Sequence, residues 1–271
     1  MSQAAAARVE EVLSRDDCEG VTTLTLNRPK QRNSLSEVLM AALTAEMTAI
    51  AEDPSVRVVV LAANGPVFSA GHDLKELTAA RQQEDRGRTY YQDIMKRCST
   101  MMLSILQNPK PVIAKVHGTA TAAGCQLVAT CDLAIAAEGA HFATPGVNIG
   151  LFCSTPMVAL SRNVSRKHAM EMLLSGDMVD ANHAAEIGLI NRAVSAETLD
   201  TEVSDLATKI ASKSSMTVSI GKRAFYDQLE LGVSEAYAYT SEVMVQNMLT
   251  HDAEEGVNAF IEKRDPTWED R

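Results

Sequence analysis

Residues 68–74 read Phe-Ser-Ala-Gly-His-Asp-Leu, and they follow an apolar run from Val56 to Ala62 that only Arg57 interrupts. Such a run is typical of a strand buried in a parallel sheet. The stretch opens a predicted helix, and its small residues let the backbone approach a ligand closely. We therefore expect a strand-to-helix corner of an α/β protein, with peptide N–H groups free to donate hydrogen bonds.

A second corner of the same kind spans residues 118–126, Gly-Thr-Ala-Thr-Ala-Ala-Gly-Cys-Gln, and also follows a predicted buried strand, Val112 to Val116. Two such corners that converge on one point can supply two backbone donors to a single developing oxyanion. The alternative is that small residues only allow close packing of a helix. Spacing alone leaves both interpretations open.

The rest of the chain predicts an alternating core followed by helices. Two β-rich runs, 9–13 and 21–26, predict a hairpin around Asp-Asp-Cys-Glu-Gly at 16–20. Ser36 is placed to cap a helix, and later segments predict helices at 89–106 and 122–131 with a strand at 133–136. Almost all of 196–263 predicts helix. We expect a core over residues 1–195 and a helical C-terminal region over 196–271. The apolar positions of the Ser36 helix are Leu39, Leu43, Met47 and Ile50.

Composition narrows the classes of function. The 271 residues carry a net charge of −10 with scattered lysines and arginines, which argues against binding to nucleic acid or to a membrane surface. No apolar stretch approaches the ~20 residues that span a bilayer. No metal-site or mononucleotide motif occurs, so we expect no metal. Five cysteines without C-x-x-C spacing, and acidic residues before Gly20, favour a cytoplasmic protein with reduced thiols.

Several strings in this order and spacing resemble the enoyl-CoA hydratase/isomerase family, also called the crotonase family. They include 68–77, which contains the first corner, and 122–127 with Cys131 and Asp132 behind it. The resemblance continues through Asn27 to Lys30 near the start and Phe260 to Arg264 near the end, so it covers nearly the whole chain. It implies an α/β spiral of ββα units with C-terminal helices that form a homotrimer or a homohexamer.

The resemblance also implies an acyl-CoA site, with CoA bound as part of the substrate and no permanently bound cofactor. The amides of Ala70 and Ala123 would form the oxyanion hole for the thioester carbonyl. Lys30 and Lys263, the latter from a neighbouring subunit, would meet CoA phosphates. The remaining residues implied to contact CoA are Gln31, Arg32, Ser69, Ala70, His72, Asp73, Leu74 and Phe260.

Two departures from the family pattern bear on the reaction. Hydration of a 2-enoyl thioester needs one proton removed from water and one delivered to the α carbon, and family hydratases use two glutamates for this. The matching positions here are Gln126 and Gly146. Neither residue exchanges a proton usefully near neutral pH. We therefore expect efficient hydration to be absent.

Other side chains near the corners are weaker candidates. Ser154 corresponds to a carboxylate of some relatives, although residues 152–156 also fit a strand-to-helix turn with Ser or Thr as cap. His72 adjoins the first corner and is the remaining proton carrier, or a structural histidine. Cys125 lies at a helix start where a thiol pKa can fall, and a buried inert thiol is the alternative.

Two classes of function fit these residues. One is an acyl-CoA enzyme that uses the oxyanion hole with little carboxylate help, as a slow hydratase/isomerase or as a decarboxylase or hydrolase. The other is a non-catalytic acyl-CoA binder.

Overall fold

The computed structural model describes residues 12–271, and in this part of the chain two sheets form the core. The larger sheet has the strand order β1-β2-β3-β5-β7-β10, and the smaller has the order β4-β6-β8-β9. The larger sheet contains β1 (Leu13–Cys18), β2 (Val21–Leu26), β3 (Val58–Ala63), β5 (Val112–Val116), β7 (Leu133–Ala137) and β10 (Arg192–Val194). The smaller contains β4 (Val67–Ser69), β6 (Thr119–Thr121), β8 (His141–Ala143) and β9 (Val179–Asp180).

A repeated unit explains the two sheets. The pairs β3-β4, β5-β6 and β7-β8 each place their first strand in the larger sheet and their second strand in the smaller one. A helix follows each pair: α3 (Leu74–Ala80), α5 (Ala123–Thr130) or the 3₁₀ helix η2 (Pro145–Ile149). The first strands are parallel and mostly buried, which explains why they are almost entirely apolar. The predicted spiral of ββα units is present.

The N-terminal hairpin differs from its predicted boundaries. Residues 1–11 lie outside the described part, so most of the strand predicted at 9–13 cannot be compared. Asp16, Asp17 and Cys18, expected in the turn, belong to β1, and the turn is only Glu19-Gly20, with φ of 48° and 81°. Two positive φ angles are typical of a tight hairpin turn. The residues of this edge strand after Leu13 are exposed and mostly polar, so the hydrophobic pattern does not identify them as a strand.

Helices cover both faces of the larger sheet. The α2 helix (Glu37–Glu52) is capped by Ser36, whose hydroxyl accepts a hydrogen bond from the Leu39 amide at 3.3 Å, as predicted. It packs against α4 (Arg88–Leu106) in the main core. The opposite face is covered by α9 (Leu199–Ala211), whose Leu199, Val203 and Ala207 are buried against the sheet. By its contacts α9 belongs with the core, and the division after residue 195 stays a prediction.

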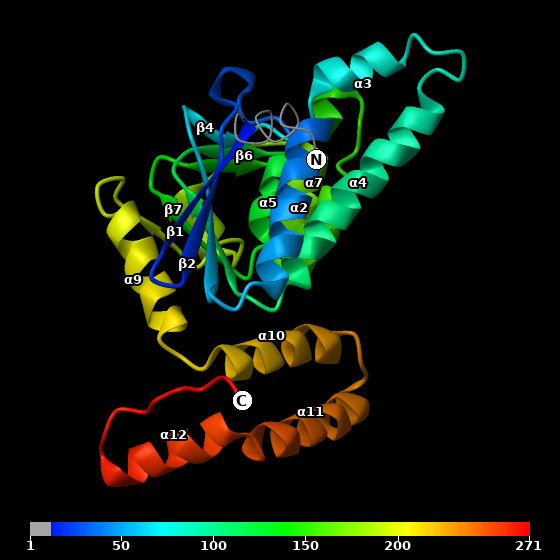
Figure 1. The fold of residues 1–271 in the computed structure, drawn as a ribbon. Coiled ribbons are helices and arrows are strands. Elements are labelled where there is room, and N and C mark those ends of the chain that lie inside the picture. Colours follow the sequence, from blue (N-terminus) through cyan, green and yellow to red (C-terminus); the bar gives the residue numbers. More distant parts are fainter. Residues whose placement is uncertain (1–11) are drawn as a thin grey trace.

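The last three helices lie together at one end of the molecule (Figure 1). They are α10 (Ser215–Leu229), α11 (Val233–Met248) and α12 (His251–Glu262). The remaining helices are η1 (Pro29–Gln31), α6 (Pro156–Asn163), α7 (Arg166–Ser175) and α8 (Ala181–Glu186). Within residues 12–271 no helix is both long and apolar enough to cross a membrane.

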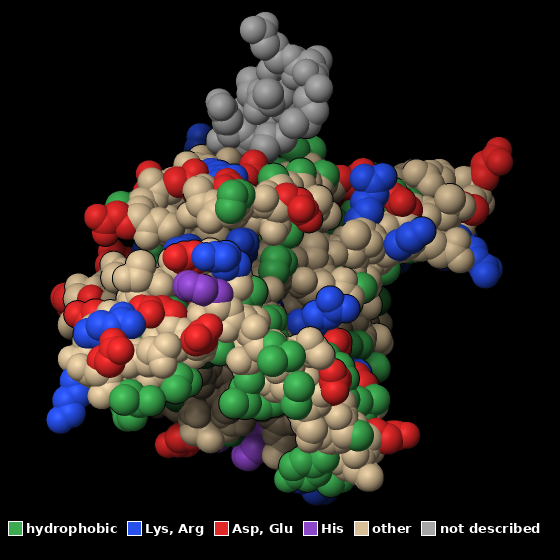
Figure 2. All heavy atoms as spheres, turned by 60° about the horizontal axis from the view of Figure 1, so that its bottom comes forward, with side chains coloured by type: hydrophobic (Ala, Val, Ile, Leu, Met, Phe, Trp, Pro, Cys, Tyr) green, Lys and Arg blue, Asp and Glu red, His purple; other side chains and the backbone are tan. Residues whose placement is uncertain are grey.

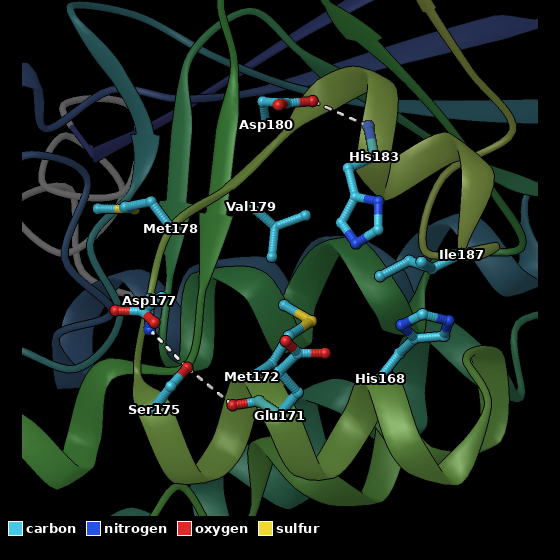
Figure 3. Close-up of a pocket in the computed structure, with 10 residues that line it drawn as sticks. All are labelled: His168, Glu171, Met172, Ser175, Asp177, Met178, Val179, Asp180, His183 and Ile187. Carbon is cyan, nitrogen blue, oxygen red and sulfur yellow. Dashed lines mark hydrogen bonds between the residues drawn. The ribbon is translucent and has the colours of Figure 1, made fainter.

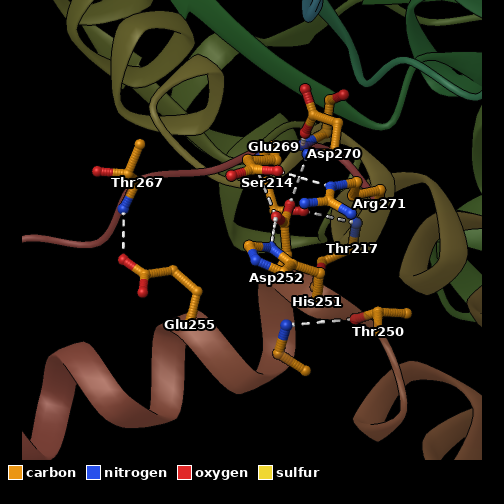
Figure 4. A network of polar contacts seen from close by, with 12 residues as sticks. Ser214, Thr217, Thr250, His251, Asp252, Glu255, Thr267, Glu269, Asp270 and Arg271 are labelled. Carbon is orange, nitrogen blue, oxygen red and sulfur yellow. Dashed lines mark hydrogen bonds and ion pairs between the residues drawn. The ribbon is translucent and has the colours of Figure 1, made fainter.

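A polar network fastens the C-terminal tail to these helices (Figure 4). The buried Asp252 carboxylate accepts hydrogen bonds from the amides of Glu269 (2.8 Å) and Asp270 (3.0 Å). Asp270 in turn pairs with Arg57 at 3.1 Å and accepts from the Ser215 amide at 2.7 Å. The tail therefore ties α12, the start of α10 and the loop before β3 together.

Candidate functional site

The candidate site lies at one edge of the smaller sheet. Strands β4, β6 and β8 are parallel, so their carboxyl ends meet at the same edge. The segments that leave this edge contain Ala70 to Leu74, Ala122 to Gln126, and Thr144 to Gly146. Carboxyl ends of parallel strands are where α/β proteins usually bind ligands.

Glycines bring the first two corners into contact. A β carbon added at Gly124 would collide with the Ser69 carbonyl oxygen, so α5 can approach the end of β4 only with glycine at this position. A β carbon at Gly71 would stand 3.0 Å from the Ala123 amide nitrogen and from the Ala122 side chain. Gly71 also has φ of 84°, which favours glycine. The two corners are therefore in contact.

One of the two predicted amide donors is wrong. The Ala70 amide already donates to the Arg32 carbonyl at 3.0 Å, and the Gly71 amide donates to the Ser69 hydroxyl at 3.3 Å. The His72 amide, next along the chain, has no acceptor among the described residues. Nothing local in the sequence signals this shift of two positions, because the competing carbonyl of Arg32 comes from a distant loop.

The second donor stays available. The Ala123 amide begins α5 and has no acceptor within residues 12–271, and Ala123 has a negative φ. The residue before it, Ala122, has φ of 51° and ψ of −120°, a conformation that residues with side chains rarely adopt. Such backbone strain is often found at functional sites. The two free amides, His72 and Ala123, thus follow the facing ends of β4 and β6.

The positions of the two missing glutamates are both buried. Gln126 is 6% exposed and its Oε1 has no hydrogen-bond partner among the described residues. At Gly146 an added β carbon would lie 2.9 Å from both the Cys153 sulfur and the Leu151 carbonyl oxygen. The thiol of Cys153 therefore occupies the space where a side chain at 146 would begin.

Burial favours the neutral form of the His72 side chain. Burial lowers the pKa of the imidazole below its ordinary value of 6.5. The Leu35 backbone contacts the ring and opposes this shift, but neither ring nitrogen has a hydrogen bond of good geometry to a described residue. A neutral imidazole offers one donor and one acceptor, so it can hold a polar group of a ligand.

The other reactive candidates behave as structural residues. Ser154 is exposed and its hydroxyl bonds to the Phe152 carbonyl at 3.4 Å, within a turn, although neither Ser154 nor Thr155 caps α6. Burial raises the pKa of Cys125 to about 12, so an activated thiol at this position is wrong. Burial also raises the pKa of Cys153.

The predicted CoA contacts near the N-terminus lie beside the first corner. Lys30, Gln31 and Arg32 are exposed, and the bond from Ala70 to the Arg32 carbonyl joins their segment to the corner. Asp73 is placed to hold the two segments together.

Three groups engage the Asp73 carboxylate. It pairs with Arg28 at 3.3 Å, accepts from the Ser34 hydroxyl at 3.1 Å, and caps α3 by accepting from the Lys75 amide at 3.1 Å. Burial opposes ionisation, but these groups lower the pKa of Asp73. The Asp73 side chain therefore acts in structure, as does the buried Ser69 hydroxyl, which donates to the Asn33 carbonyl at 2.9 Å. Leu74 is half exposed.

Two predicted CoA contacts lie elsewhere in the chain. Phe260, 86% exposed, and Lys263 are at the end of α12, at the opposite end of the molecule from α3 (Figure 1). One chain does not bring them to the corner. Their contribution from a neighbouring subunit stays a prediction.

A separate pocket of about 210 Å³ lies between α7 and α8 (Figure 3). His168 and His183 face each other across it with ring centroids 5.8 Å apart, and Glu171 and Asp180 lie at its margin. No group of three or more His, Cys, Asp or Glu side chains that could hold a metal ion occurs within residues 12–271. The pocket shares no residue with the two corners.

Known proteins match the sequence of this chain over nearly its whole length. The family pattern described as enoyl-CoA hydratase/isomerase matches residues 16–271. Enoyl-CoA hydratase domain-containing protein 3, mitochondrial, of Rattus norvegicus is 47% identical over 250 residues, which are 92% of this chain and 82% of the relative. The Homo sapiens protein of the same name is 46% identical over 92% of this chain and 81% of its own length.

Solved structures match the fold of this chain over nearly its whole length. A crystal structure of an enoyl-CoA hydratase of Mycobacterium smegmatis has a TM-score of 0.90 at 52% identity and covers 95% of this chain and 98% of its own. The human domain-containing protein 3 structure has a TM-score of 0.90 at 45% identity, over 95% of this chain and all of its own. The predicted spiral fold is confirmed. The word mitochondrial in the relatives' names does not fit the expected cytoplasmic compartment.

Proposed function

Because the chain belongs to the enoyl-CoA hydratase/isomerase family, we propose that it binds an acyl-CoA thioester and polarises the thioester carbonyl. The observation that carries this proposal is the pair of free amides, His72 and Ala123, at two touching corners. Fixed N–H donors aimed at one oxygen stabilise the charge that develops there. CoA enters as part of the substrate.

Polarisation of the carbonyl has a defined chemical use. As electrons move toward the carbonyl oxygen, the α carbon becomes able to lose a proton or a carboxylate group, and the β carbon of an enoyl ester becomes electrophilic. The two amides stabilise the enolate oxygen common to these reactions. They supply no proton, so a proton carrier must come from another group.

Hydration of 2-enoyl esters is expected to be slow, because neither Gln126 nor Gly146 supplies a carboxylate. An acid/base group typically contributes ~10²- to 10⁴-fold, so the loss of two costs at least about four orders of magnitude. Decarboxylation is the reaction that this site is best suited to catalyse, because departure of CO₂ needs no base and water can protonate the α carbon of the enolate that remains. A purely binding role is the second candidate, and the same absence of carboxylates supports it.

The first experiment tests the amide pair directly. We expect the C=O stretching frequency of bound butyryl-CoA, measured by Raman difference spectroscopy, to fall below its value in solution. We also expect S-butyl-CoA, a thioether without the carbonyl, to bind at least about 10-fold more weakly than butyryl-CoA. An unshifted frequency together with equal affinities would show that no oxyanion hole acts here.

The second experiment tests the reaction. Malonyl-CoA should yield acetyl-CoA faster than in buffer, and crotonyl-CoA should be hydrated slowly at best. The variant Gln126→Glu restores one base and should raise crotonyl-CoA hydration by at least about 10²-fold. Gln126→Met is the matched control, with similar volume and no base. If every ester binds but reacts no faster than in buffer, catalysis is excluded and the purely binding role is supported.

Restoration of the second glutamate requires a different design. The nearest atoms to a new β carbon at position 146 are the Cys153 sulfur and the Leu151 carbonyl oxygen, both at 2.9 Å. Gly146→Glu therefore needs the loop 151–153 to move, and failure of that variant would report packing rather than chemistry. Gln126→Glu alone is the clean comparison.

A further inference from the structure

The pocket between α7 and α8 brings two imidazoles and one thioether to the same space (Figure 3). His168 and Met172 lie one turn apart on α7, so their side chains lie on the same side of that helix. His183 faces them from α8, and its ring centroid is 5.8 Å from that of His168. Met172 is 3% exposed, and its sulfur is turned toward the space that the two rings border.

His183 is held in the orientation that a metal ligand needs. Its Nδ1 lies 3.1 Å from the Glu186 carboxylate oxygen Oε2. An ionised carboxylate only accepts hydrogen bonds, so Nδ1 carries the proton and Nε2 of the neutral ring keeps its lone pair. Histidines that bind metals commonly donate their other ring nitrogen to a carboxylate in this way. The lone pair of His183 Nε2 is therefore available to a cation.

Acidic side chains at the pocket favour a cation over an anion. Glu171, Asp177 and Asp180 line it, and its described lining contains no lysine or arginine. Among the His, Cys, Asp and Glu side chains of residues 12–271, no group of three could hold a metal ion. The carboxylates therefore contribute charge, and the third ligand must be of another kind.

We propose that His168, Met172 and His183 bind one soft monovalent cation, Cu(I). Thioether sulfur selects soft cations such as Cu(I), and imidazole also binds copper. Ca²⁺ and Mg²⁺ prefer oxygen ligands, and zinc sites in proteins are built from thiolate, imidazole and carboxylate ligands. The sequence did not predict this site, because its ligands come from two helices and follow no metal-site motif.

The first test measures the affinity for copper. Cys18 is exposed and its thiol can also bind Cu(I), so full-length Cys18→Ser serves as the parent for every measurement. The parent is titrated without oxygen with Cu(I) against the coloured chelator bicinchoninate. We expect each chain to remove one Cu(I) from the chelator.

Substitution of the thioether tests its role in metal selection. Met172→Leu has a similar volume and no sulfur, and it should weaken Cu(I) binding by at least about 10-fold. Zn(II) has little preference for thioethers, so its weak binding to the two imidazoles should stay unchanged in this variant. Met170→Leu is the matched control, because Met170 is 46% exposed on the same helix and does not line the pocket. It should bind Cu(I) like the parent.

Substitution of a histidine should affect both metals. His183→Gln should weaken Cu(I) and Zn(II) binding alike, by at least about 10-fold. His141→Gln, at an exposed histidine outside the pocket, is the matched control and should keep the parent affinities.

A measurement on the parent does not depend on how well a variant folds. Methionine methyl signals are followed by NMR while Ag(I), a soft monovalent cation that does not change its oxidation state, is added. The Met172 signal, identified by its absence in Met172→Leu, should shift at one equivalent, while the Met170 signal should not. A chelator that keeps all the copper, an unchanged Cu(I) affinity in Met172→Leu, or an unmoved Met172 signal would each overturn the proposal.

Discussion

At the scale of single residues, Ala122 holds the most unusual backbone of the site. Its φ of 51° and ψ of −120° are in a sparsely populated region of the Ramachandran plot. Residues with a β carbon are strained there by about 1–3 kcal/mol. Glycine avoids this strain, although it lowers the free energy of unfolding by up to about 1 kcal/mol because it increases the conformational entropy of the unfolded chain. We expect Ala122→Gly to raise the free energy of unfolding by about 1 kcal/mol in urea denaturation.

A matched control lies on the helix that follows. Ala129 is buried in α5 with ordinary helical geometry, so Ala129→Gly should lower the free energy of unfolding by about 1 kcal/mol. Two glycine substitutions seven residues apart should thus have opposite signs. Destabilisation by both would mean that Ala122 is not strained.

His72 gives a pH dependence whose sign follows from burial. Its folded-state pKa is lowered below 6.5, so the unfolded chain binds the proton more readily. The stability contribution is complete above pH 6.5 and is lost as the pH falls from 6.5 toward the folded-state pKa. We expect His72→Gln to lose less free energy of unfolding than the parent between pH 7 and pH 5. His141→Gln, at an exposed histidine, should follow the parent.

At the scale of elements, the longer, mainly apolar strands were predictable and the short strands were not. The strand predicted at 112–116 matches β5, and the helix predicted at 89–106 matches α4 within one residue. The strands β6 and β8 have only three residues each, too few to show periodicity, yet with β4 they form the edge of the site. The sequence indicated both corners. It could not identify His72 as the donor, because the Ala70 amide is occupied by the Arg32 carbonyl, which comes from another loop.

A buried ion pair and two further hydrogen bonds attach α10 to the core, and their contribution to stability can be measured. Lys222 is 7% exposed and donates to Asp132 at 2.7 Å and to the Lys110 carbonyl at 3.0 Å. Tyr226 donates to the other oxygen of Asp132 at 2.8 Å. Burial lowers the pKa of Lys222, and the Asp132 carboxylate opposes this shift.

Removal of the lysine leaves a buried carboxylate without its partner cation. We expect Lys222→Met to lower the free energy of unfolding by about 3–5 kcal/mol in denaturant titration. Arg223→Met, one residue along the same helix, removes an exposed pair with Asp227 and should have no measurable effect. Equal effects of the two variants would show that the Lys222 pair does not anchor α10.

At the scale of the whole molecule, the C-terminal helices expose many large apolar side chains. Exposed side chains gather on α11 and α12 and around an apolar hollow of about 610 Å³ beside Trp268. Figure 2 turns this end of the molecule forward and shows hydrophobic side chains over its lower part. The most exposed are Val233, Tyr237, Leu249, Phe260 and Ile261. Patches of this kind mark interfaces between proteins.

We therefore expect the chain to assemble through this surface, as a species of three or six times the 29.2 kDa chain mass in sedimentation equilibrium. Leu249 is 77% exposed, so Leu249→Asp costs the isolated chain little but places a charge in the interface. It should shift the population toward 29.2 kDa, while Val38→Asp on α2 should not. If Lys263 meets CoA across the interface, Leu249→Asp should also weaken acyl-CoA binding. A parent protein that sediments as a monomer would contradict both the interface and a shared site.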